Sequence, residues 1–159
     1  MLNKKGRLYR AAITITALLA LALAMDALGI AWNNHQLKKA LMAIDTPTVS
    51  LNAVVPFAWD AVYTFEPYLS KAEMAEIIGF KSGALRQTVS EGMTQLVFVK
   101  GTSVVASVCG YPAPGKLGYS VWLDNWAGSA AKVTFAEEAV FSVDALDGIL
   151  RLHQIAKGA

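Results

Sequence analysis

The chain has 159 residues, of which 55% are hydrophobic and only 16% are charged, and its mean hydropathy is +0.41. This length fits one folded unit, and the charged fraction is below that of typical soluble proteins, so one segment should hold most of the apolar excess. The net charge of +2 comes from a basic N-terminal tail, and the rest of the chain is nearly neutral, with no basic stripe interleaved with aromatic residues. We therefore expect no nucleic-acid partner.

Residues 11–32 form an apolar run in which Asp26 is the only charge. As a helix rising about 1.5 Å per residue, the run would cross a hydrocarbon core of about 30 Å. Basic residues stay in the cytoplasm, and more of them precede the run than follow it closely: Lys4, Lys5, Arg7 and Arg10 against Lys38 and Lys39. This predicts a cytoplasmic tail over residues 1–10, a single transmembrane helix over 11–32, and a body outside the bacterial inner membrane.

A cleaved secretory signal is the alternative for the same segment. The basic start, the apolar stretch and the small-residue triplet Ala22-Leu23-Ala24 all match such a signal, and cleavage would release a secreted domain. The apolar run continues past the triplet to Trp32, which suits the outer headgroup belt. We therefore favour an uncleaved anchor embedded in the bilayer.

Asp26 has two interpretations. If the span begins at residue 11, the carboxylate lies deep in the membrane, where it costs a few kcal/mol unless it is protonated or partnered by another membrane protein. If the span covers residues 8–25 instead, Asp26 lies at the outer interface among waters. We favour the interfacial position and keep Asp26 as a candidate partner contact.

Residues 33–45 continue the helical pattern, so we expect a stiff helical stalk that ends at Thr46-Pro47. Leu37, Leu41 and Ile44 form an apolar stripe along it. The stripe could pack on the protein's own sheet, which is the commoner case, or on a partner helix. In the second case it would extend a contact made by Asp26, so these three residues are candidate partner contacts.

Beyond Pro47 the pattern predicts an extracytoplasmic α+β domain over residues 46–159, with a mainly antiparallel sheet and one short helix. The helix is expected at 71–79, with a capping box at Ser70 and Glu73 and a stop at Gly79. Asp147-Gly148 indicates a type I′ hairpin near the C-terminus, and a helix from Asp144 is the alternative. The expected strands are 49–55, 59–65, 95–100, 103–108, 119–123, 140–143 and 150–152.

The segment Trp59 to Tyr68 matches the pattern Trp-Asp-x-x-Tyr-x-Phe-x-Pro-Tyr, and Leu96-Val97-Phe98-Val99-Lys100 follows it. In these motifs the chain resembles an uncharacterised family of short bacterial extracytoplasmic proteins that are membrane- or lipid-anchored. The resemblance covers roughly residues 55–110 and implies an anchored domain, with no known activity. The long membrane run departs from the lipid-anchored members.

Groups for catalysis or metal binding are scarce. Cys109 is the only cysteine, and the two histidines, His35 and His153, have no ligands at metal spacing. Glu137 and Glu138 are adjacent, so they would point to opposite faces of a strand or lie in a turn, and they are poor candidates for a catalytic carboxylate pair. We expect no metal, no cofactor and no enzyme activity.

Aromatic residues remain as candidate contacts. On the strand at 59–65, Trp59, Tyr63 and Phe65 should share a buried face, while Asp60 and Tyr68 could form part of a rim for a peptide or partner protein. Trp126, near Trp122, is expected in an exposed turn. The leading function is a non-catalytic, membrane-tethered binding or assembly subunit that contacts another membrane or envelope protein. The alternative is an extracytoplasmic hydrolase that uses Asp60 or Asp124 as a base inside a concave pocket.

Overall fold

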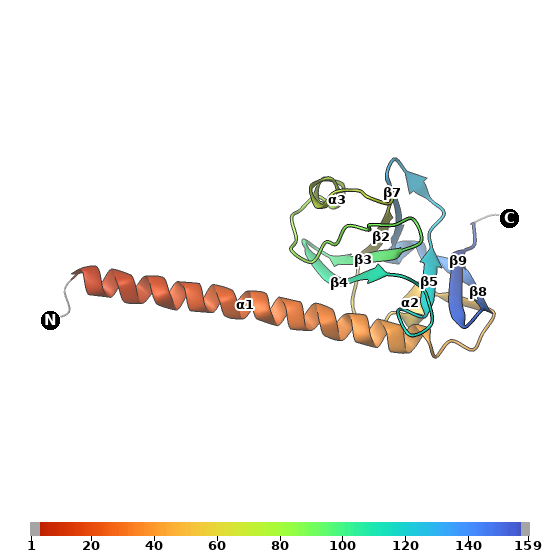
Figure 1. The fold of residues 1–159 in the computed structure, drawn as a ribbon, viewed down its shortest axis with the longest axis horizontal. Helices are drawn as coiled ribbons and strands as arrows, with labels where there is room; N and C mark the ends of the chain where they lie inside the picture. Colours follow the sequence, from red (N-terminus) through yellow and green to blue (C-terminus); the bar gives the residue numbers. More distant parts are fainter. Residues whose placement is uncertain (1–3, 157–159) are drawn as a thin grey trace.

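A computed structural model describes residues 4–156, in which one long helix, α1 (Lys4–Leu41), leads into a domain of two β-sheets (Figure 1). Residues 1–3 of the predicted basic tail lie outside the described residues, as do the side chains of Lys4, Lys5, Arg7 and Arg10. The N-terminal part of α1 projects away from the domain, and its apolar side chains are exposed. The α+β class and the N-terminal apolar helix are as predicted.

A five-stranded antiparallel sheet forms the middle of the domain, in the order β4-β3-β2-β7-β6. Its strands are β2 (Ala61–Phe65), β3 (Thr94–Lys100), β4 (Ser103–Gly110), β6 (Trp126–Ala127) and β7 (Ala130–Thr134). Both faces of this sheet are covered, since every residue of β3 except Lys100 is buried. One face packs on the end of α1 and on the second sheet, and the other face is covered by α3 (Lys71–Ile78).

The second sheet has four strands in the order β1-β8-β9-β5. Its strands are β1 (Thr48–Ser50), β5 (Tyr119–Trp122), β8 (Val140–Leu146) and β9 (Ile149–Gln154), and β5 runs parallel to β9. Phe141, Tyr119 and Leu152 point from this sheet into the main core. On the opposite face Trp122 and Asp144 are exposed, Ser142, Arg151 and His153 are partly exposed, and Ser120 is buried.

Most predicted elements are confirmed. Helix α3 has the capping box of Ser70 and Glu73, and Gly79 ends it in the left-handed conformation at φ 88°. The hairpin of β8 and β9 turns at Asp147 and Gly148, both at positive φ, as a type I′ turn requires. The expected C-terminal strands are therefore correct, and the alternative helix from Asp144 is not formed.

Two expectations near Pro47 and Trp59 are wrong in detail. The strand expected at 49–55 stops at Ser50, because the Ser50 hydroxyl accepts a hydrogen bond from the Asn52 N–H and caps a short helix, α2 (Leu51–Val54). Trp59 lies before β2 begins and packs in the main core with Val62, whereas Tyr63 lies on the opposite, α3-covered face. Trp59 and Tyr63 therefore do not share a face. A short 3₁₀ helix, Phe135–Glu137, precedes β8.

Candidate functional site

Two asparagines clamp α1 to the edge of the five-stranded sheet. Asn34 forms a pair of hydrogen bonds with Ser107 of β4: its Oδ1 accepts from the Ser107 N–H and its Nδ2 donates to the Ser107 carbonyl, each at 2.9 Å. Asn33 Nδ2 donates to the Val105 carbonyl at 2.8 Å. These side chains satisfy backbone groups that an edge strand would otherwise leave open. The direction of α1 is therefore fixed relative to the sheet.

The apolar stripe of the stalk completes the domain's own core. Leu37 and Leu41 are 1% and 0% exposed, and Ile44 is half-buried against the same cluster. The proposed partner role of this stripe is wrong for Leu37 and Leu41, because both side chains are already enclosed by their own domain. The helix also ends at Leu41, four residues before the predicted end of the stalk.

Asp26 lies on the side of α1 that faces the domain. It lines two adjoining hollows of about 410 and 370 Å³ between α1 and the domain, together with Leu23 and Ile30 of the helix. Ser82 and Gly83 form the opposite wall of both. The carboxylate therefore lies where α1 leaves the domain, beside a polar loop.

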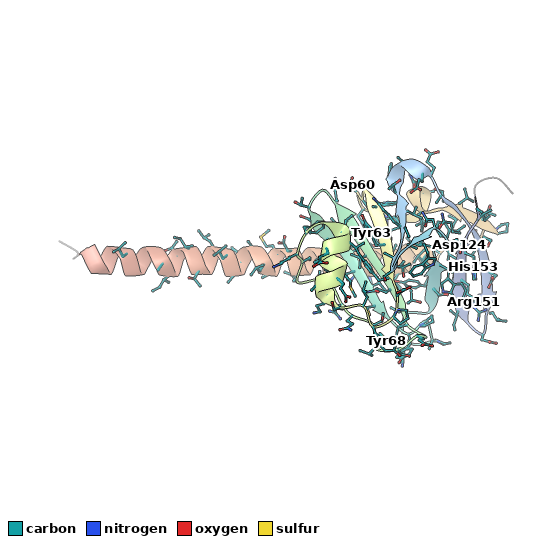
Figure 2. The ribbon with its side chains drawn as sticks, turned by 90° about the horizontal axis from the view of Figure 1, so that it is seen from above. Asp60, Tyr63, Tyr68, Asp124, Arg151 and His153 are labelled. Carbon is teal, nitrogen blue, oxygen red and sulfur yellow. The ribbon has the colours of Figure 1, made fainter. Side chains whose placement is uncertain are left out.

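Asp60 and Tyr68 are at opposite ends of β2 and do not form one rim (Figure 2). One carboxylate oxygen of Asp60 accepts a hydrogen bond from the Gly101 N–H at 2.7 Å, which stabilises the β3–β4 turn. Tyr68 has φ 68°; its N–H donates to Thr88 Oγ1 and its carbonyl accepts from Gln87 Nε2. The Asp60 carboxylate therefore stabilises a turn. The Tyr68 ring is exposed at the other end of β2, away from Asp60.

The open face of the four-stranded sheet carries a group of polar and aromatic side chains from three neighbouring strands. The rings of Trp122 and His153 meet edge to face at 4.0 Å between centroids, and Trp122 is 45% exposed. On the adjacent ladder Ser142 is opposite His153, and Asp144 is opposite Arg151. We name this group, Trp122, Ser142, Asp144, Arg151 and His153, the outer sheet face; Figure 2 labels Arg151 and His153 on it.

Sequence reasoning missed most of this surface. From the sequence, His153 is a candidate only for metal binding or catalysis. The alternation of Arg151 and His153 with Leu150 and Leu152 on the last strand is the signal that places the two polar residues on the exposed side. The contact of His153 with Trp122 depends on the parallel pairing of β5 and β9, which local sequence does not encode.

Trp126 is 48% exposed, as expected for a residue near a turn, but it lies on the short edge strand β6. Its N–H donates to the Asp124 carbonyl at 3.0 Å. Trp126 belongs to the five-stranded sheet and Trp122 to the four-stranded one, so the two tryptophans are on separate sheets.

Asp124 lines a small pocket of about 290 Å³ with Asn125, Glu137 and Gln154. The Asp124 N–H donates to Gln154 Oε1 at 3.0 Å, and Glu137 accepts hydrogen bonds from the Thr134 N–H and hydroxyl. The pocket places Asp124 beside other polar groups, which is the geometry that a carboxylate base requires. The Asp60 carboxylate, by contrast, is bound to a turn.

Cys109 lies in a hollow of about 310 Å³ that is also lined by His35, Lys38 and Arg86. Burial raises the pKa of the Cys109 thiol, and the positive charge of Arg86 opposes this in part. Burial also raises the pKa of Tyr119 to about 12. Within residues 4–156, no cluster of three or more histidine, cysteine or acidic side chains could hold a metal ion.

The chain was compared with known proteins at three levels. No family model, no curated protein and no solved structure matches it. The resemblance to the uncharacterised anchored family therefore stays a prediction.

Proposed function

We propose that the chain is a single-pass subunit of a bacterial envelope complex, with its N-terminus in the cytoplasm and a domain outside that binds another membrane or envelope protein. The observation that carries the proposal is the division of α1. Its N-terminal part is apolar, exposed and long enough to cross a membrane, while its C-terminal end is built into the core of the domain through Leu37 and Leu41. A helix of this kind would hold its domain at a fixed height above the membrane and in a fixed orientation relative to it.

The outer sheet face is the surface that we assign to the partner. It lies on the sheet at the end of the domain remote from the free half of α1 (Figure 1). Tryptophan and arginine side chains carry most of the binding energy in many protein interfaces, because they bury a large area and still donate hydrogen bonds. Trp122 and Arg151 supply these groups here, and Ser142 and His153 add polar contacts around them.

The anchor is tested by fractionation. The full chain, expressed in bacteria with a C-terminal tag, should stay with membranes after a carbonate wash and should keep its own N-terminus. A reporter active only in the cytoplasm should be silent when fused after Ala159. A soluble body that begins at Met25 would show that Ala22-Leu23-Ala24 is a cleavage site, and an active reporter would reverse the orientation.

The partner surface is tested by photocrosslinking in intact cells. A photoreactive phenylalanine at position 122 should give a discrete adduct, which Arg151→Glu should remove. The matched control is the same group at Tyr111, which is 39% exposed in the loop after β4. Equal adducts at both positions, or none at 122, would contradict the assignment of the partner to this face.

One observation favours a second candidate, a hydrolase that uses Asp124 as its base. Asp124 shares its pocket with Asn125, Glu137 and Gln154, so a bound water would have several polar partners there. The purified chain is assayed against ester, phosphate, glycoside and peptide substrates, with Asp124→Asn as the matched variant. Turnover that Asp124→Asn abolishes would establish this candidate, and turnover equal in both proteins, or none in either, would remove it.

A further inference from the structure

Three segments of the domain gather where α1 leaves it. They are α3, the loop of residues 80–83, and the β3–β4 turn at Gly101–Thr102, and we call them together the membrane-proximal end. Figures 1 and 2 show α3 at this end, lying across the direction of α1. A groove of about 730 Å³ runs along α3 to Lys81 and Ser82, and the hollow beside Asp26 joins the loop and Thr102 to α1.

The height of this end above the membrane follows from the helix. A hydrocarbon core of about 30 Å takes roughly 18–20 helical residues, so in the span from Leu8 to Met25, which we favour, Asp26 is the first residue above the hydrocarbon. The headgroup layer adds roughly 5–7 Å, or about four more residues. The hollows place the loop opposite the stretch of α1 from Leu23 to Asn34. The loop is therefore at the level of the headgroups.

The composition of this end suits a lipid interface. Ile77 is 41% exposed and Phe80 is half-buried, and the exposed lysines Lys71, Lys81 and Lys100 flank them. Partly exposed apolar side chains beside lysines are typical of surfaces that lie in the headgroup region, where the ammonium groups reach phosphates.

The acidic groups of the membrane-proximal end are Asp60, Glu73 and Glu76. Asp60 accepts from the Gly101 N–H, and Glu73 accepts from the Ser70 N–H in the capping box. Two of the three carboxylates are hydrogen-bonded to backbone and remain charged, and Lys71, Lys81 and Lys100 match the three in number. Asp26 of α1, beside the loop, adds one further negative charge.

We propose that the membrane-proximal end rests on the lipid headgroups of the leaflet from which α1 emerges. The inference rests on the proposed anchor and adds a second point of contact. The hydrogen bonds of Asn33 and Asn34 fix the domain relative to α1, and the headgroup contact fixes it relative to the bilayer. In the resulting orientation the outer sheet face is directed away from the bilayer.

The test measures depth in the membrane. The full chain with Cys109→Ser is placed in vesicles of phosphatidylethanolamine and phosphatidylglycerol, and a nitroxide label is attached to a single new cysteine at Lys81 or Thr102. Collisions with oxygen and with a water-soluble nickel complex then report the depth of the label. Leu18→Cys, in the middle of the span, and Ala145→Cys, exposed on β8, are the two controls.

We expect the labels at Lys81 and Thr102 to collide with nickel about threefold less than the label at Ala145, as headgroup-level sites do. Nickel accessibility at both positions equal to that at Ala145, with Leu18 in hydrocarbon, would overturn the headgroup contact and leave the anchor intact. A water-accessible label at Leu18 would overturn the anchor, and the headgroup contact with it.

Discussion

At the scale of single residues, the side chains that join α1 to the domain are the most informative. Asn34 behaves as an extra strand residue, since its amide pairs with both backbone groups of Ser107. Leu37, one turn further on, is enclosed by the core. Within one turn of helix, Asn34 is therefore hydrogen-bonded to the sheet and Leu37 is packed in the core. A helix that served only as a flexible tether would need neither contact.

Asn34→Ala should lower the free energy of unfolding by about 2 kcal/mol, because it leaves the N–H and carbonyl of Ser107 without their partners. The full chain in detergent, unfolded with urea, provides the measurement, and hydrogen exchange at the Ser107 amide should accelerate. His35→Ala is the matched control, since the neighbouring His35 side chain is exposed. Equal losses in the two variants would show that the clamp adds no stability.

Leu41→Ala should cost about 2–5 kcal/mol, as expected for a fully buried leucine whose removal leaves a cavity. Lys39→Ala, an exposed change two residues earlier, should alter stability by less than about 0.5 kcal/mol. Leu41→Glu should prevent folding of the domain, because it buries an unpaired charge. A folded Leu41→Glu variant that only loses its partner would restore the interpretation of the stripe as an external contact.

The thiol of Cys109 should lose its proton at a higher pH than the thiol of a free cysteine, because burial raises its pKa. Its reaction rate with N-ethylmaleimide should therefore rise at a higher pH than that of a free thiol. Arg86→Gln removes the positive charge that opposes this effect, so the midpoint should move higher still. Arg151→Gln, a change on a different sheet, should leave the midpoint in place, and a downward shift in Arg86→Gln would contradict the electrostatic explanation.

At the scale of elements, the sequence is a good guide wherever a local rule decides the structure. The capping box at Ser70 and the Asp147-Gly148 turn each need particular residues, and both are found where they were expected. Pairings between distant strands have no such signal. The parallel alignment of β5 with β9 joins residues about thirty positions apart, and Trp122 joins the outer sheet face only because of it.

Ser70→Ala should destabilise the domain by about 1 kcal/mol, since it removes the oxygen that accepts from the Glu73 N–H. The hydrogen bonds from Ser70 lower the pKa of Glu73. A carboxyl group with a lowered pKa stabilises the folded state above its unfolded value of 4.5, and this stabilisation is lost as the pH falls through the folded value.

The stability difference between the wild-type chain and Ser70→Ala should therefore shrink as the pH falls from 7 to below 4. Urea midpoints across this range provide the measurement. Glu76→Gln, a change at an exposed glutamate of the same helix outside the capping box, is the control and should not alter the pH dependence in this way. A difference that stays constant with pH would show that the Ser70 hydroxyl does not interact with the Glu73 carboxylate.

At the scale of the whole molecule, membrane and domain meet around one stretch of helix. Leu23, Asp26 and Ile30 of α1 line the hollows, and Asn33 and Asn34 bind the sheet directly after them. The depth of the span in the membrane and the orientation of the domain therefore depend on one continuous stretch of helix. The interfacial interpretation of Asp26 agrees with this geometry. A loop with Ser82 and Gly83 opposite the carboxylate is compatible with water and headgroups and incompatible with hydrocarbon.

The position of Asp26 leads to a prediction about insertion. Asp26→Leu should leave membrane retention and domain stability unchanged, because a carboxylate already at the interface has no desolvation cost to recover. Leu19→Asp places the same group near the middle of the span and should cost about 3 kcal/mol on an insertion scale. The carbonate-resistant fraction of each variant, measured on the full chain in bacterial membranes, provides the comparison. Higher retention in Asp26→Leu than in the wild type would show that the carboxylate lies in hydrocarbon, and loss of the crosslink at position 122 in this variant would make Asp26 a partner contact.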